Sequence, residues 1–181
     1  MKILLKEQPT KLIEDEYKES KTINITKIHI GGILLGVFLC YQLSYLLDIT
    51  LFDNELNFRV YKKVYLFLLI FPLHELLHAA LFPNYKKSVI GFSIKKFVFY
   101  ADYDGELSKY QIMKVCLAPL FILTLLPLLF LLVYKNSLIA YIVLFNLLGS
   151  GYDIILYFIM LKQPSNRLFK FANSKVFYKD Q

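Results

Sequence analysis

Two histidines and a glutamate lie together in an otherwise apolar stretch of the chain. The stretch is "FPLHELLHAALF", residues 71–82, and it contains His74, Glu75 and His78. Residues four apart face the same side of a helix, so the two imidazoles are able to converge on one ion. A glutamate directly after the first histidine lies near a metal-bound water and is able to accept its proton. This HExxH spacing predicts a divalent metal site with Glu75 as general base.

Asp153 is the candidate for a third protein ligand. Four long apolar windows of the sequence cover residues about 30–47, 64–82, 115–134 and 138–161. Apart from the three residues of the motif, Asp153 is the only Asp, Glu, His, Lys or Arg within them. His74 and His78 precede Lys86 by twelve and eight residues, and Asp153 precedes Lys162 by nine. At about 1.5 Å per helical residue, all three side chains lie roughly 12 to 18 Å from the same membrane boundary. We therefore expect them to meet at one level and to bind Zn²⁺.

Small residues and an amide precede Asp153 on its window. Gly149, Ser150 and Gly151 allow this window to approach the second window closely, and they are able to loosen the helix beside the aspartate. Asn146 lies one helical turn before Ser150, further from the cytoplasmic boundary, where a buried amide is able to hold a ligand or to orient a substrate carbonyl. We therefore include Asn146 as a candidate substrate-binding residue.

The four apolar windows must position these groups. They contain no lysine or arginine and are apolar nearly all round, which favours membrane-spanning helices over buried helices of a soluble protein. The loop between the second and third windows, residues 84–114, is rich in β-branched and aromatic residues around a turn sequence, which predicts a short β hairpin. Ser108 and Gln111 have the spacing of a capping box that opens the third helix.

The expected fold class is therefore an all-α membrane protein with four transmembrane helices and a short cytoplasmic β hairpin between helices 2 and 3. Residues 1–181 form one domain in this interpretation. The helices cover residues about 30–47, 64–82, 115–134 and 138–161.

Basic residues indicate the orientation in the membrane. Six lysines precede the first window, six lie in residues 84–114, and four lysines and one arginine follow the last window. Because basic residues crowd cytoplasmic loops, both termini and the middle loop are expected in the cytoplasm of a multi-pass cell-membrane protein. The basic residues are interspersed with acids and form no single patch, which argues against nucleic acid as a partner. Cys40 and Cys116 lie in different windows, which predicts packing roles.

At these residues the chain resembles the intramembrane zinc metalloproteases of the site-2 type, and more closely a group of small bacterial membrane proteins described as zincin peptidases. The resemblance rests on HELLH at 74–78, "APL" at 118–120, "NLLGSGYD" at 146–153 and the proline at 164. It implies that His74, His78 and Asp153 hold zinc, that Glu75 activates water, and that the substrate is a membrane protein or peptide.

Alternatives remain open at this point. The same two histidines and aspartate would serve a non-catalytic metal-binding membrane protein, such as a transporter, a sensor or an immunity-type protein, but that protein would have no chemical need for Glu75. In a structural or immunity-type interaction protein, the same groups would instead form a buried hydrogen-bonded cluster.

Overall fold

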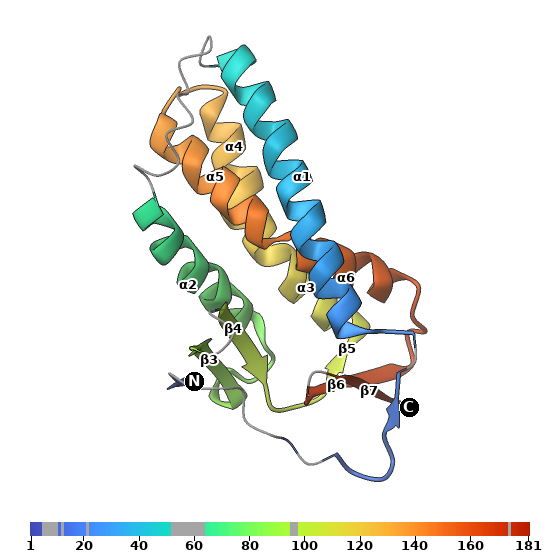
Figure 1. Cartoon of the computed structure of the whole chain (residues 1–181). Helices are drawn as coiled ribbons and strands as arrows, with labels where there is room; N and C mark the ends of the chain where they lie inside the picture. The colour runs from blue at the N-terminus through green and yellow to red at the C-terminus, as the bar shows by residue number, and fades with distance from the viewer. Residues whose placement is uncertain (5–10, 12, 21, 52–63, 95–97, 174) are drawn as a thin grey trace.

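The computed structural model describes residues 1–4, 11, 13–20, 22–51, 64–94, 98–173 and 175–181. Within these ranges a group of apolar helices stands on two small β-sheets, and both chain termini lie at the sheet end of the helices (Figure 1). The helices are α1 (Ile25–Leu51), α2 (Val64–Leu81), α3 (Lys109–Leu120), α4 (Leu126–Leu131), α5 (Ser137–Gly149) and α6 (Gly151–Leu161), with a π-helical segment, Phe121–Leu125, between α3 and α4.

The first sheet has three strands in the order β1-β3-β4. The hairpin of β3 (Ser88–Ser93) and β4 (Val98–Tyr103) lies between α2 and α3 as expected, and β1 (Lys2–Leu4) pairs with β3 in parallel. The second sheet has the order β2-β7-β6-β5 and is antiparallel. It consists of β2 (Lys18–Glu19), β5 (Leu107–Ser108), β6 (Arg167–Ala172) and β7 (Lys175–Asp180).

The predicted all-α fold with four transmembrane helices is therefore wrong. Two sheets are present. Among the described residues, only two continuous helical stretches are long and apolar enough to cross a membrane: Ile25–Leu47 in α1, and Lys109–Leu131, which joins α3, the π-helical segment and α4. The pair α5 and α6 bends by 52° and counts as a third, broken span if its halves are taken together, whereas Tyr65–Leu81 is shorter. The length of an apolar segment predicts a membrane span, but it does not show whether the helix in that segment is bent or too short to cross the membrane.

The bend between α5 and α6 follows from the small residues at 149–151. Ser150 ends one helix and precedes the next, and Gly151 lies against α1 so closely that an added Cβ would come 1.9 Å from the carbonyl oxygen of Gly32. Contrary to the expectation of close contact with the second window, this closest backbone approach is to α1. Gly149 does face α2, where an added Cβ would lie 3.1 Å from the Phe71 ring.

The second sheet supports the helices that position Asp153. Leu156 and Met160 of α6, Ile112 of α3 and Phe169 of β6 share one buried apolar cluster. The capping box predicted at the start of the third helix is confirmed at Ser108, which caps α3. This packing fixes α3 and α6 against the same sheet, on either side of the candidate site.

Candidate metal centre

The two histidines of the HExxH stretch face each other across one turn of α2. Their Nε2 atoms are 3.1 Å apart, and both imidazoles are buried. Pro72 is two residues before His74, inside the same helix. The spacing of four residues places both rings on one helix face, as predicted.

Asp153 approaches this pair from the first turn of α6. Its Oδ2 lies 3.1 Å from Nε2 of His74 and 3.3 Å from Nε2 of His78. The Asp153 side chain is buried, and the break at Ser150 places it at the positively polarised N-terminus of α6, which favours a carboxylate. Among the described residues, these three form the one group of His, Cys, Asp or Glu side chains arranged to hold a metal ion.

The far side of the His74 ring is held by Asn146. Nδ1 of His74 lies 2.9 Å from Oδ1 of Asn146, while Nδ2 of that amide lies 3.0 Å from the carbonyl oxygen of Pro119 and 2.8 Å from Oγ1 of Thr124. A backbone carbonyl only accepts hydrogen bonds, so the amide NH₂ must face Pro119 and the amide oxygen must face the imidazole. His74 Nδ1 is therefore the donor in this contact.

The His78 ring is held in the same way by a backbone carbonyl of α3. Its Nδ1 lies 2.9 Å from the carbonyl oxygen of Val115. In a regular helix that carbonyl would accept the N–H four residues later, but residue 119 is a proline and has no N–H. Pro119 thereby leaves the Val115 carbonyl free for the histidine.

The chemistry of the donor set fits a cation. With both Nδ1 atoms protonated, a neutral His74 and a neutral His78 each present a lone pair at Nε2, and Asp153 adds a carboxylate oxygen at 3.1–3.3 Å. Three electron-rich atoms so close repel one another unless a proton or a metal ion lies among them. Two ligands bound tetrahedrally to zinc at about 2.0–2.1 Å are about 3.3 Å apart, which agrees with these distances. Histidines whose second nitrogen donates to a carbonyl are typical metal ligands.

Glu75 lies beside this group and is not part of it. It follows His74 on α2, is half-buried, and lies within hydrogen-bonding reach of the backbone of Ala101 in β4. Because successive helical residues point about 100° apart, its carboxylate approaches the donor set from the side that faces the first sheet. This placement is compatible with a base next to the metal.

The structure brings His74, His78 and Asp153 together, and it places Asn146 directly behind His74. The contact of Asn146 with substrate stays a prediction. His29 lies apart from the donor set and stacks on Tyr152. Cys116 is buried in the apolar cluster that α3 and α6 share with the second sheet. Sequence reasoning missed the Val115 carbonyl and Thr124. The signal for the first was available, since a proline four residues after any helical residue frees its carbonyl.

Comparison with known proteins gives one match. No curated protein and no solved structure matches the chain significantly. A family model described as "Putative zincin peptidase" matches residues 67–168, more than half of the 181 residues. The matched region contains the HExxH stretch, Asn146 and Asp153, and the name zincin implies zinc as the metal. The chain therefore belongs to the putative zincin peptidase family.

Proposed function

We propose that this chain is an intramembrane zinc metallopeptidase related to the site-2 type, which hydrolyses peptide bonds of membrane proteins. In this proposal His74, His78 and Asp153 hold Zn²⁺ and Glu75 is the general base. The observation that carries it is the convergence of three lone-pair-bearing atoms at 3.1–3.3 Å, with both histidine Nδ1 atoms already committed to carbonyl oxygens. Family membership supports the same reading.

Hydrolysis of a peptide bond at this site needs one acid–base group and one Lewis acid. When bound, Zn²⁺ supplies Lewis acidity, which lowers the pKa of water and polarises a peptide carbonyl. Glu75 takes a proton from the attacking water and returns it to the leaving nitrogen, so that one carboxylate works first as a base and then as an acid. Asn146 and the Val115 carbonyl keep the two imidazoles oriented with Nε2 toward the centre.

The edge of β4 is suited to hold the substrate. β4 pairs with β3 on one side and is the last strand of its sheet among the described residues, and it lies along α2 with Ala101 next to Glu75. An extended peptide that adds to this edge would place its backbone beside the Glu75 carboxylate. Strand addition also exposes peptide groups that a regular helix would shield. We therefore assign substrate alignment to β4.

The helix surfaces support a place in the membrane. Large apolar side chains of α1, α2, α3 and α4 are exposed over much of their length, including Val37 and Phe38 on α1 and Leu68 and Leu69 on α2. Contiguous apolar surface of this kind is rare on soluble monomers. The described parts of the three lysine-rich segments lie at the sheet end of the helices together with both termini (Figure 1), which agrees with a cytoplasmic sheet end.

The test compares wild-type protein with Glu75→Gln. Both are expressed at equal levels in cells, zinc is measured on the purified proteins, and new N-termini within membrane proteins are mapped by mass spectrometry. We expect equal zinc content in both and new termini only with the wild type, because the amide keeps the shape of Glu75 but has no base function. Glu19→Gln, which removes an exposed ion pair with Lys175, is the matched control and should cleave normally.

The outcomes separate the candidate functions. Equal cleavage by Glu75→Gln would remove Glu75 from the mechanism. A wild-type protein that contains zinc but produces no new termini would favour a non-catalytic metal-binding protein. A metal-free wild-type protein would overturn the site itself.

A further inference from the structure

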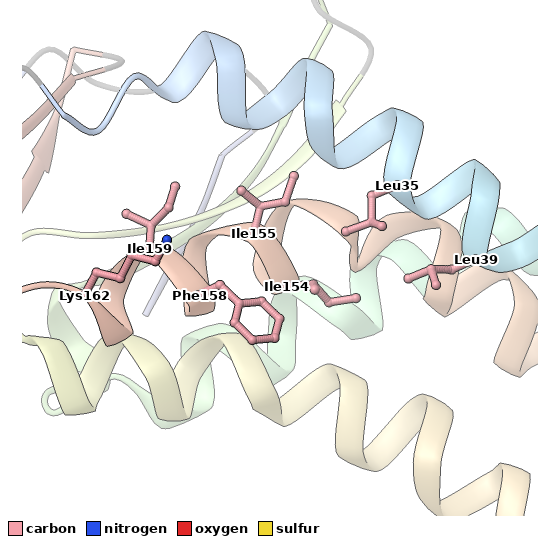
Figure 2. A pocket seen from close by; sticks show the side chains of 7 residues that line it. All are labelled: Leu35, Leu39, Ile154, Ile155, Phe158, Ile159 and Lys162. Atoms are coloured by element: carbon pink, nitrogen blue, oxygen red, sulfur yellow. The ribbon is translucent and has the colours of Figure 1, made fainter.

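A long apolar groove lies between α1 and α6, on the outside of the helices. Its volume is about 390 Å³. Leu35 and Leu39 form its wall on α1, and the rest of the lining comes from α6 and the residue after it (Figure 2). The α6 side consists of Ile154, Ile155, Phe158, Ile159 and Lys162.

The groove exists because α6 turns away from the direction of α5. The two helices differ by 52°, and the turn occurs where Gly151 touches Gly32 of α1. Beyond this contact Ile28 of α1 and Leu156 of α6 still share a buried cluster, and no described element covers the groove on the outer side of the two helices. Six of its seven lining side chains are hydrocarbon, so in a membrane an apolar chain must fill the space.

One end of the groove carries positive charge. Lys162 is exposed, and its amino nitrogen lies beside Ile159 at the end of the row of apolar side chains (Figure 2). A second amino group, that of Lys109, donates to the carbonyls of Leu161 and Gln163 on either side of Lys162. Among the described residues neither lysine has a carboxylate within ion-pair distance, whereas Lys175 and Lys179 of the C-terminal hairpin both do.

We propose that this groove binds an anionic phospholipid, with an acyl chain along α1 and α6 and the phosphate at Lys162. A long apolar wall that ends in an unpaired ammonium group matches a lipid in both parts, since lysine stems lie along apolar surface and place the charge at the headgroup level. The site does not depend on catalysis. It lies against the turn of α6 that carries Asp153, because Ile154 lines both this groove and a smaller cavity of about 130 Å³ that Asp153 borders.

Lipid retention by the purified full-length protein tests this site. Native mass spectrometry measures binding of phosphatidylglycerol and of phosphatidylcholine with identical acyl chains. We expect wild type to bind phosphatidylglycerol about fivefold more tightly, the effect of one basic residue near an anionic headgroup. Lys162→Gln should abolish this preference, and Leu39→Phe should weaken binding of both lipids by filling the groove.

Two matched variants serve as controls. Lys135→Gln removes a lysine between α4 and α5, away from the groove, and Leu34→Phe enlarges an exposed side chain of α1 that does not line it. Both should bind lipid as wild type does. If Leu39→Phe fails to fold, Leu35→Phe replaces it. A preference that survives Lys162→Gln, or equal lipid retention by wild type and both groove variants, would mean non-specific lipid contact and would overturn the proposal.

Discussion

Asn146 uses all the hydrogen-bonding groups of its side chain inside the protein. Its oxygen accepts from His74, and its NH₂ group has Pro119 and Thr124 as acceptors, with Ser150 Oγ a further 3.3 Å contact. The side chain is almost fully buried, at 1% exposure. Replacing the amide therefore leaves the His74 Nδ1–H without its acceptor and lets the ring turn.

We expect Asn146→Ala to lower zinc affinity by about 10- to 100-fold, the usual effect of losing a partner of a metal-ligating histidine. Thr124→Val keeps the shape of its side chain and removes one acceptor of the amide, so its effect should be smaller. Competition with a chromogenic chelator measures both. Asn166→Ala is the control, because Asn166 is exposed and contacts Gln181 through its backbone carbonyl. An affinity for Asn146→Ala within twofold of wild type would refute this role.

At the scale of the helices, α3 contributes to the site through a missing hydrogen bond. Pro119 has no N–H for the Val115 carbonyl, and that carbonyl accepts from His78 instead. The π-helical segment begins two residues later and contains Thr124, the partner of Asn146. Irregular helix geometry of this type frequently marks functional sites. Here it supplies one acceptor to His78 directly and another to Asn146, the amide that holds His74.

Pro119→Ala should therefore separate fold stability from metal binding. The alanine restores an N–H that competes for the Val115 carbonyl, so we expect zinc affinity to fall about tenfold. Alanine is also the better residue inside a helix, so the thermal midpoint of the metal-free protein should stay equal or rise. Chelator competition and thermal unfolding measure the two effects. Pro127→Ala, at the start of α4, is the control and should leave zinc affinity unchanged.

The helices were partly predictable from the sequence. The window at 64–82 corresponds closely to α2 (Val64–Leu81), because a long apolar run in which only His74, Glu75 and His78 are polar favours a helix. The window at 138–161 was predicted as one helix but contains two. The sequence does not decide between them, because Ser150 and its flanking glycines are compatible with either a packing notch or a break. Only the close contact of Gly151 with α1 decides between these, and that contact is tertiary.

The C-terminal hairpin was missed although the sequence carried a signal for it. The segment "RLFKFANSKVFYKD" has aromatic residues that alternate with or adjoin polar ones on both sides of a turn, and Asn173 in that turn has a positive φ of 52°. For the site, helix periodicity and depth along the helices brought His74, His78 and Asp153 together. The valine side chain at position 115 gives no indication of a role in the site, because Val115 contributes its backbone carbonyl.

For the whole molecule, the two ends of the chain are held together by a polar cluster at the second sheet. The Tyr17 hydroxyl donates to the Glu106 carboxylate, which also lies 2.8 Å from Nζ of Lys179. The hydrogen bond from Lys179 lowers the pKa of Glu106, and burial together with the bond to Glu106 raises the pKa of Tyr17 to about 12. The bond to Glu106 also raises the pKa of Lys179.

These shifts set the pH range over which the N-terminal segment stays attached. A carboxyl group with a lowered pKa stabilises the fold above its ordinary value near 4.3 and loses that effect as the pH falls through the folded value. A tyrosine with a raised pKa stabilises the fold below about pH 10, its ordinary pKa, and loses that effect as the pH rises through the folded value of about 12. We therefore expect constant protection from about pH 5 to 10 and a loss on either side.

Hydrogen exchange at Ser20, whose N–H donates to the Val176 carbonyl, measures this attachment as a protection factor. Glu106→Gln should abolish the acid loss, and Tyr17→Phe should abolish the alkaline loss. Glu19→Gln, which breaks an exposed ion pair on the same sheet, should leave the profile unchanged. A protection factor that stays constant below pH 4 in wild type would contradict the role of Glu106.

Metal binding should also stabilise the assembly of the helices, because the donor set joins α2 to α6. A ligand that binds only the folded state at 100 times its Kd stabilises it by about 2.7 kcal/mol, which corresponds to a thermal midpoint shift of about 5–10 °C for a chain of this size. We expect chelation to lower the midpoint of wild type by that amount and to leave His78→Ala unchanged. Glu75→Gln should still respond, because Glu75 lies outside the donor set. A wild-type midpoint that does not move on chelation would mean that no metal links these two helices.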